Sequence, residues 1–256
     1  MLLPSFRLDH KVALITGAGR GIGKALALGF AEAGADVVII SRTEADLQQL
    51  AKEIRYLGRK AYPIAANIRS RAEIEQAVNQ AVEQAGRIDI LVNNAGMNIR
   101  SKALDVTDEE WETIMQTNLK SAFICSQLVG SLMKEQGSGS IINISSVGGH
   151  VALRTGVVYA ASKAAMIQMT KVLAMEWGKS GIRVNALGPW YFNTPLTEKL
   201  LSDPVYLGEI ISRTPMQRVG ELPELVGPAV FLASDAASYM TGQTLFVDGG
   251  MTIFGF

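Results

Sequence analysis

The chain has 256 residues, and its 24 basic and 24 acidic side chains give a formal net charge of zero. A balanced charge produces no overall field that would recruit nucleic acid or an anionic membrane, so neither is expected as a partner. Cys125 is the only cysteine, and no signal peptide or membrane-length apolar run is visible, so a reducing, cytoplasmic location is expected.

The first predicted unit is a strand at 11–16, a glycine-rich turn, and an amphipathic helix that runs to about residue 33. The turn reads Gly17-Ala18-Gly19-Arg20-Gly21-Ile22-Gly23. Glycines permit a tight turn and close approach of a ligand, and free N–H groups at the helix start favour a pyrophosphate. The spacing T-G-x-x-x-G-x-G departs from the G-x-G-x-x-G fingerprint, and this departure is itself informative.

Short runs rich in β-branched residues then alternate with stretches of helical periodicity. Further strands are predicted at 37–40, 61–66, 88–92, 140–144, 182–186 and 244–247, and helices at about 44–57, 70–85, 108–135 and 157–178. Such alternation predicts an α/β fold in which a doubly wound parallel sheet carries helices on both faces. The motif order favours one domain over 1–256.

The end of the second predicted strand bears on the choice between NAD and NADP. An NAD enzyme usually carries Asp or Glu there, whereas this chain has Ser41 and Arg42. Ser41 can donate to a 2′-phosphate, and Arg42 can bind it through its guanidinium fork. Glu44 is the rival, although 43–46 also fits a capped helix start with acids in its first turn. NADP(H) is therefore the predicted cofactor.

The predicted helix at 157–178 carries Tyr159 and Lys163 in the sequence Y-A-A-S-K. This spacing places both side chains on one helix face, so the ammonium is expected beside the phenol oxygen. A free phenol has a pKa near ~10, and a neighbouring cation brings it toward neutral pH, where an acid/base catalyst works. The same spacing is also typical of a core-edge tyrosine and a solvated lysine.

One stretch, at about 190–214, breaks the alternation of strands and helices. It contains Pro195 and Pro204 and fits short helices inserted after a strand. Ligands bind outside the carboxyl ends of strands in open α/β sheets, so this insertion is a candidate substrate lid.

Further motifs join the glycine turn and Y-x-x-x-K in a set whose order along the chain is known from one protein family. They are Asn93-Asn94-Ala95-Gly96 after the strand at 88–92, Asn118, Ser146, and the tail Val247-Asp248-Gly249-Gly250. With the glycine turn and Y-x-x-x-K, they resemble the short-chain dehydrogenase/reductase family in its single-domain form, over nearly the whole chain. Residues 191–251 are further similar to gluconate 5-dehydrogenase-like members.

The resemblance implies a Rossmann-type fold and an NADP(H)-dependent oxidoreductase that interconverts a ketone and a secondary alcohol. A sugar acid or polyol is the implied small-molecule substrate. Relatives commonly form homotetramers through the two long helices, here expected at about 108–135 and 157–178.

The resemblance also assigns catalytic roles. Tyr159 donates a proton to the carbonyl oxygen, Ser146 holds that oxygen, Lys163 lowers the pKa of Tyr159 and binds the nicotinamide ribose, and Asn118 supports a relay water. Asn118 fits a helix kink equally, and Ser146 fits an ordinary strand end. The implied cofactor contacts are Gly17, Gly19, Arg20, Gly21, Ile22, Gly23, Ser41, Arg42, Asn67, Ile68, Asn94, Ala95, Gly96, Tyr159, Lys163, Pro189 and Thr194. Among them, Arg20 is the second basic residue expected of NADP-preferring relatives.

Two positions depart from the family pattern, and two more are candidate substrate contacts. Asn67 replaces a common Asp, but its amide oxygen can still accept from adenine. Trp190 follows Pro189 where relatives usually have glycine, so its indole either shapes the substrate cleft or packs the lid. Arg100 either holds a substrate carboxylate or is a solvated loop arginine, and His150 is either a substrate contact or solvated. No His, Cys or acid cluster has metal-ligand spacing, so no metal is predicted.

Other functions share many of these residues. A 3-oxoacyl-carrier-protein reductase, or a broad carbonyl reductase, would carry the same catalytic set. Carrier-protein reductases dock an acidic partner through arginines at the active-site entrance, and by motif offset those places hold Gly137 and Ser180, which weighs against this alternative. A non-catalytic, nucleotide-sensing binding protein is the alternative from another class. Degenerate relatives of that kind usually lack the tyrosine or the lysine, and this chain lacks neither.

Overall fold

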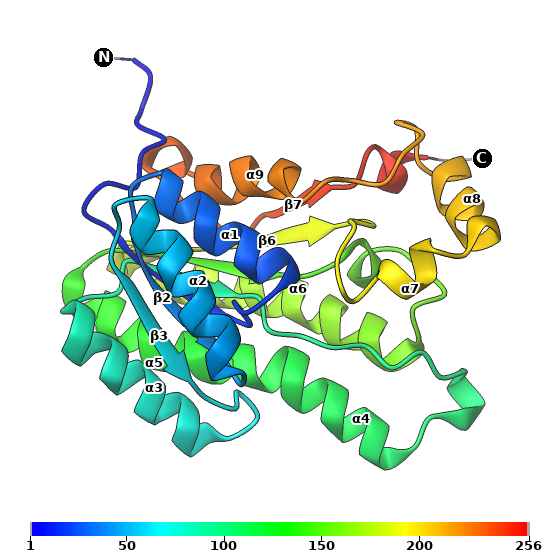
Figure 1. Cartoon of the computed structure of the whole chain (residues 1–256), viewed down its shortest axis with the longest axis horizontal. Helices are drawn as coiled ribbons and strands as arrows, with labels where there is room; N and C mark the ends of the chain where they lie inside the picture. Colours follow the sequence, from blue (N-terminus) through cyan, green and yellow to red (C-terminus); the bar gives the residue numbers. More distant parts are fainter. Residues whose placement is uncertain (1, 255–256) are drawn as a thin grey trace.

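The structure is a computed structural model that describes residues 2–254. Within this part of the chain, seven parallel strands form one sheet in the order β3-β2-β1-β4-β5-β6-β7 (Figure 1). The strands are β1 Val12–Thr16, β2 Asp36–Ser41, β3 Ala61–Ala65, β4 Ile90–Asn93, β5 Gly139–Ile144, β6 Ile182–Pro189 and β7 Thr244–Val247. The prediction of a single-domain, doubly wound parallel sheet is therefore confirmed.

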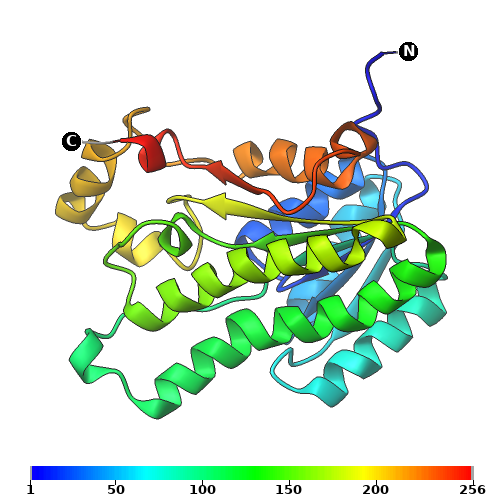
Figure 2. The same ribbon diagram turned by 180° about the vertical axis from the view of Figure 1, so that it is seen from behind.

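Helices cover both faces of the sheet (Figures 1 and 2). One face is covered by α1 Gly21–Glu32, α2 Glu44–Tyr56 and α9 Pro223–Ala233, and the other by α3 Arg71–Ala85, α5 Ser121–Gln136 and α6 Val157–Trp177. Successive strand residues point to opposite faces, so Ala13 and Ile15 enter one core while Val12 and Leu14 enter the other. Burial on both faces explains why the strands read as continuous apolar runs.

Two elements differ from the expectation based on sequence. The predicted helix at 108–135 is divided into α4 Asp108–Met115, a π-helical turn Gln116–Lys120, and α5. Helix α9 was not predicted, and it contains Pro228, a residue type that usually ends or kinks a helix. Burial of Leu225, Ala229 and Leu232 against the sheet stabilises α9 despite that proline.

The predicted functional motifs meet at the carboxyl edge of the sheet. The chain reverses its direction of strand addition between β1 and β4, and in such sheets this switch point is where ligands bind. Residues 190–222, between β6 and α9, hold α7 Glu198–Leu201 and α8 Pro204–Ser212 and lie beyond this edge (Figure 1). No helix within residues 2–254 is long and apolar enough to cross a membrane.

Candidate active site

The glycine-rich turn after β1 leaves space that side chains would fill. Gly17 has φ +66°, and a Cβ there would lie 2.8 Å from Ala95 Cα. At the start of α1, Arg20 has an extended backbone and makes no side-chain capping bond. The first N–H groups of α1 therefore lack a side-chain acceptor and suit an anion such as a pyrophosphate.

Thr16 joins the turn after β1 to the turn after β4. Its Oγ1 accepts from the backbone N–H of Asn94 at 3.1 Å and of Ala95 at 3.2 Å. The Asn94 side chain in turn donates to the carbonyls of Thr16 and Gly17, at 3.0 and 3.1 Å. Asn94 thus holds the glycine turn in place. Thr16 was not among the predicted site residues, although it is the first letter of the T-G-x-x-x-G-x-G motif.

Ser41, at the end of β2, presents a buried hydroxyl that has no hydrogen-bond partner among residues 2–254. A Cβ on Gly19 would lie 3.1 Å from this Oγ and 3.6 Å from Oδ2 of Asp46. Asp46 therefore places a carboxylate beside the glycine turn, and Glu44, the rival weighed for a ribose, is the first residue of α2. An unpaired donor next to a glycine fits the adenosine end of a dinucleotide.

Two exposed cations, Arg20 and Arg42, flank this region. Ile68 is half-buried and packs against the core on the α3 side. Asn67 Oδ1 accepts from the Arg69 N–H at 3.1 Å, so one of its two lone pairs is already used within the loop. The remaining lone pair is available for an adenine amino group.

Asn118 lies fully buried within the π-helical turn. Its Oδ1 accepts from the Met97 N–H at 2.8 Å, and its Nδ2 donates to the Met97 carbonyl at 2.9 Å and to Ser162 Oγ at 3.1 Å. Both amide protons are therefore used, and one lone pair of Oδ1 remains. Such π turns often occur at functional sites. Asn118 fixes the loop after β4 against α6, where Ser162 had not been predicted as a site residue.

Lys163 is buried, and its Nζ donates to the Ile144 carbonyl at 2.7 Å. Burial lowers the pKa of this ammonium to about 8. A Cβ on Gly96 would lie 3.4 Å from Asn118 Oδ1 and 3.6 Å from Lys163 Nζ. Glycine at this position therefore keeps open a corner lined by an acceptor and a cation.

Tyr159 lies in the first turn of α6, half-buried, with Lys163 Nζ 5.7 Å from its ring centroid. Burial raises the pKa of the phenol above its ordinary value, and hydrogen bonding by the Ser146 hydroxyl and the charge of Arg100 oppose this rise. Lys163, whose ammonium bonds the Ile144 carbonyl and lies over the ring, is not among the groups that act on this pKa in the structure, so the lowering of the pKa by Lys163 stays a prediction. Ser146 Oγ also accepts from the Gly148 N–H at 3.1 Å.

Residues of the 190–222 segment approach the glycine turn. Thr194 is buried, and a Cβ on Gly21 would lie 3.7 Å from its Cβ and 3.6 Å from Pro195 Cδ. The Thr194 N–H donates to Thr197 Oγ1 at 3.0 Å, which fixes this stretch. Pro189 is buried at the end of β6, one strand away from Ser146.

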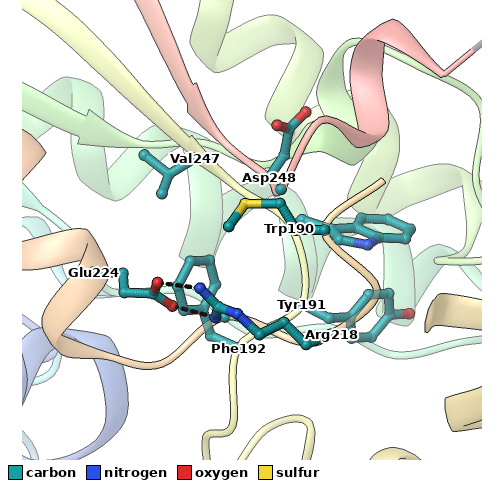
Figure 3. A pocket seen from close by; sticks show the side chains of 10 residues that line it. Trp190, Tyr191, Phe192, Arg218, Glu224, Val247 and Asp248 are labelled. Carbon is teal, nitrogen blue, oxygen red and sulfur yellow. Dashed lines mark hydrogen bonds and ion pairs between the residues drawn. The ribbon is translucent and has the colours of Figure 1, made fainter. Parts of the chain in front are cut away.

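Trp190 takes part in packing of the 190–222 segment. Its indole N–H donates to Thr214 Oγ1 at 3.0 Å, and its ring meets the edge of Tyr191. Figure 3 shows the pocket that Trp190 lines, together with Tyr191, Phe192, Met216, Arg218, Gly220, Glu224, Val247, Asp248 and Gly249. None of the four predicted catalytic residues lines this pocket. The indole bond to Thr214 fits packing of the segment, and a part for Trp190 in shaping the substrate cleft stays a prediction.

The other two candidate substrate residues differ in their surroundings. His150 is exposed and packs on the ring of Phe246, with centroids 5.0 Å apart. Arg100 is exposed, and its Nη1 donates to the Arg154 carbonyl at 3.2 Å and to the Tyr206 hydroxyl at 3.4 Å. Arg100 therefore lies against α8 and is not free in a loop. Among residues 2–254, no group of three or more His, Cys, Asp or Glu is arranged to hold a metal ion.

Gly137 and Ser180 lie at the amino edge of the sheet, opposite the edge that carries the predicted catalytic residues. Gly137 precedes β5 and Ser180 precedes β6, and the Gly139 N–H bonds the Gly181 carbonyl at 3.2 Å there. Ser146 follows β5 at the opposite edge. The absence of arginines at these two positions thus says nothing about the entrance to the chain's own site.

This fold and site define a dinucleotide-dependent oxidoreductase, with a phosphate-binding turn beside a tyrosine, a lysine and a serine. Residues 17–252 match the family model described as enoyl-(acyl carrier protein) reductase. A gluconate 5-dehydrogenase from Burkholderia cenocepacia J2315, solved in complex with NADP and tartrate, is 42% identical, with a TM-score of 0.96 and coverage of 100% of both chains.

Curated relatives lead to the same family. A 3-oxoacyl-[acyl-carrier-protein] reductase from Thermotoga maritima is 43% identical over 96% of this chain and 100% of its own length. A 2-dehydro-3-deoxy-D-gluconate 5-dehydrogenase from Escherichia coli is 39% identical over 98% of each chain. The chain belongs to the short-chain dehydrogenase/reductase family, which confirms the resemblance seen in the sequence.

Proposed function

We propose that the chain is an NADP(H)-dependent oxidoreductase that interconverts a ketone and a secondary alcohol on a sugar acid. One observation carries the proposal: Asn118 Oδ1 and Lys163 Nζ converge on Gly96, beside the phenol of Tyr159, whose pKa Ser146 and Arg100 lower against the effect of burial. Relatives named for gluconate and 2-dehydro-3-deoxy-D-gluconate support the substrate class. Tartrate, bound by the Burkholderia relative, is likewise a hydroxy acid.

The residues around the glycine turn fit a dinucleotide. N–H groups at the start of α1 would bind the pyrophosphate, the unpaired hydroxyl of Ser41 would donate to the 2′-phosphate, and Arg20 and Arg42 would neutralise it. When bound, the nicotinamide supplies or accepts the hydride. Lys163, buried beside Gly96, would hold the ribose.

Tyr159 and Ser146 would handle the substrate oxygen. In reduction, Ser146 orients the carbonyl oxygen while Tyr159 transfers its phenolic proton to it, giving the secondary alcohol. Burial raises the pKa of Tyr159, so the phenol is protonated at neutral pH and suits this donor role. In oxidation the proton returns to the phenolate, whose charge Lys163 stabilises.

Arg100 and the 190–222 segment would form the outer wall of the substrate site. Arg100 lies three residues from the Asn118-bonded Met97, and its charge acts on Tyr159. A guanidinium so placed binds a carboxylate bidentately and orients the reacting carbon. The insertion at about 190–214, which approaches the glycine turn through Thr194, would act as the substrate lid.

The substrate proposal is tested with D-gluconate and D-glucitol, which share a carbon chain and differ at C1, where one has a carboxylate and the other an alcohol. We expect NADP+ reduction with a higher kcat/KM for D-gluconate. Arg100→Ala should lower that value by roughly tenfold to a hundredfold, because a hydrogen bond to a charged group contributes about 1.5–3 kcal/mol. Turnover of D-glucitol should change by less than about twofold. Lys102→Ala, at another exposed cation of the same loop, is the matched control. Equal losses on both substrates would contradict the role of Arg100.

The cofactor proposal gives a second expected result. Arg42→Ala should raise the KM for NADPH about tenfold to a hundredfold and leave the KM for NADH nearly unchanged, because only NADPH carries the 2′-phosphate. Initial rates with both cofactors measure this, and Arg55→Ala, at a partly bonded arginine of α2, is the control. Wild-type enzyme that uses NADH as well as NADPH would contradict the proposal and direct attention to Asp46.

A second candidate function is 3-oxoacyl-carrier-protein reductase. The Thermotoga relative of that name matches this chain at 43% identity, and the argument from Gly137 and Ser180 no longer weighs against it. Oxidation of NADPH by an acetoacetyl thioester, compared with 5-keto-D-gluconate, separates the two candidates.

We further propose a cytoplasmic homotetramer. Apolar side chains are exposed on both α5 and α6, where Phe123 is 41% and Met175 is 76% exposed. Exposed apolar surface on these helices favours association between copies of the chain. The lone, buried Cys125 fits a reducing compartment. A monomeric mass by analytical ultracentrifugation would contradict the tetramer.

A further inference from the structure

Arg100 does not stand alone at the outer wall of the site. Its Nη1 donates to the hydroxyl of Tyr206 on α8 at 3.4 Å, and that hydroxyl is 2.7 Å from the hydroxyl of Tyr191. These side chains come from the loop after β4, from the start of the 190–222 segment, and from α8. A continuous polar chain therefore joins the catalytic side of the site to the proposed lid.

The hydrogen bonds within the Arg100–Tyr206–Tyr191 cluster leave several donors unused. Two hydroxyls carry two protons, and the bond between Tyr191 and Tyr206 uses only one. Within residues 2–254, neither hydroxyl donates to another acceptor, and Nε and Nη2 of Arg100 have no partner. Burial raises the pKa of Tyr191 to about 12, so its hydroxyl keeps its proton. The cluster therefore offers several donors and no free anion to receive them.

The net charge around the cluster is positive and also favours an anion. Arg100 forms no ion pair within the described chain. The neighbouring acid on α8, Glu209, is already paired with Arg154, whose guanidinium also lies 5.3 Å above the Tyr206 ring. Two cations and one anion leave a net positive charge. A cluster with more hydrogen-bond donors than acceptors and with one unpaired cation is suited to bind the carboxylate of a ligand.

We infer that Tyr206 is a substrate-specificity residue: with Arg100 it forms one carboxylate-binding site, half of which is carried by the lid helix α8. This inference rests on the proposed function, because the carboxylate is that of the sugar acid. Tyr191 orients the Tyr206 hydroxyl through their shared bond. Recognition of the acid then requires α8 to be in place, which links substrate choice to closure of the lid.

Binding of D-gluconate and D-glucitol to the enzyme saturated with NADPH tests this inference by calorimetry. An alcohol and a reduced cofactor do not react, so affinity is measured without turnover. D-gluconate should bind wild type at least about tenfold more tightly than D-glucitol. Tyr206→Phe should weaken D-gluconate binding about tenfold to a hundredfold, as expected for one hydrogen bond to a charged group, and change D-glucitol binding by less than about twofold. Tyr239→Phe, at a fully exposed tyrosine, should alter neither affinity.

Two further measurements make the result decisive. The double variant Arg100→Gln/Tyr206→Phe should lose less than the product of the single losses, because the two residues share one ligand group. The melting temperature and NADPH affinity of Tyr206→Phe should match wild type, which excludes a folding defect. The inference would be overturned by unchanged D-gluconate affinity in Tyr206→Phe. It would also be overturned by a loss in the double variant equal to the product of the two single losses, or by a wild type with no preference for D-gluconate. Failure of the proposed function would appear separately, as absence of NADPH oxidation with any ketone.

Discussion

Replacement of Tyr159 by phenylalanine is expected to lower kcat by at least ~10³-fold, within the range for loss of a general acid. The change removes the transferable proton and keeps the ring, so packing at the start of α6 should be retained. NADPH affinity should fall by no more than about tenfold, the value of one neutral hydrogen bond. Stopped-flow or steady-state NADPH oxidation, with fluorescence titration of the cofactor, measures both quantities.

The matched control is Tyr56→Phe, because Tyr56 is 93% exposed on α2 and distant from the site in sequence. It should leave both quantities unchanged. A Tyr159→Phe enzyme with near-normal turnover would show that another group supplies the proton. Loss of NADPH binding without loss of the single-turnover rate would instead assign Tyr159 to cofactor binding.

Local motifs explain why so much of the architecture was predictable. The glycine turn, Asn94-Ala95-Gly96 and Y-x-x-x-K are short patterns whose spacing reflects backbone geometry at one place in the chain. Alternating strand and helix runs reflect burial on both sheet faces, which is also a local property of sequence. Both kinds of signal act within a few residues, and the fold class follows from them.

The remaining features depend on contacts between distant parts of the chain. The π-helical turn around Asn118 interrupts a stretch that reads as one helix, and α9 is stabilised by packing that outweighs Pro228. The bond from Arg100 to Tyr206 spans 106 positions, so no local pattern indicates it. The raised pKa of Tyr159 has a similar origin, because burial is its largest cause and burial is set by the whole fold.

Replacement of Lys163 by methionine is expected to damage both catalysis and cofactor binding. Methionine keeps much of the length of the buried side chain and removes its charge. We expect kcat to fall by at least ~10²-fold and the Kd for NADPH to rise about tenfold, because one residue serves the phenol and the ribose. Lys179→Met, at an exposed lysine just beyond α6, is the control. A loss of rate with unchanged NADPH affinity would remove the ribose role.

The pH dependence of alcohol oxidation gives the sharpest test of Lys163. Oxidation needs Tyr159 as a phenolate, so activity rises as pH rises through the pKa of that phenol. A nearby ammonium stabilises the anion and lowers this pKa, and its removal must therefore move the rising limb to higher pH. Burial lowers the pKa of Lys163 to about 8, so the cation is mostly present at neutral pH and is lost above that value. Removing the buried charge removes its desolvation cost and so stabilises the folded state, while loss of the hydrogen bond to the Ile144 carbonyl destabilises it. The melting temperature should thus change by only about 2–4 °C, which corresponds to about 1 kcal/mol. A rising limb that stays in place in Lys163→Met, in an enzyme that remains folded, would show that Lys163 does not tune Tyr159.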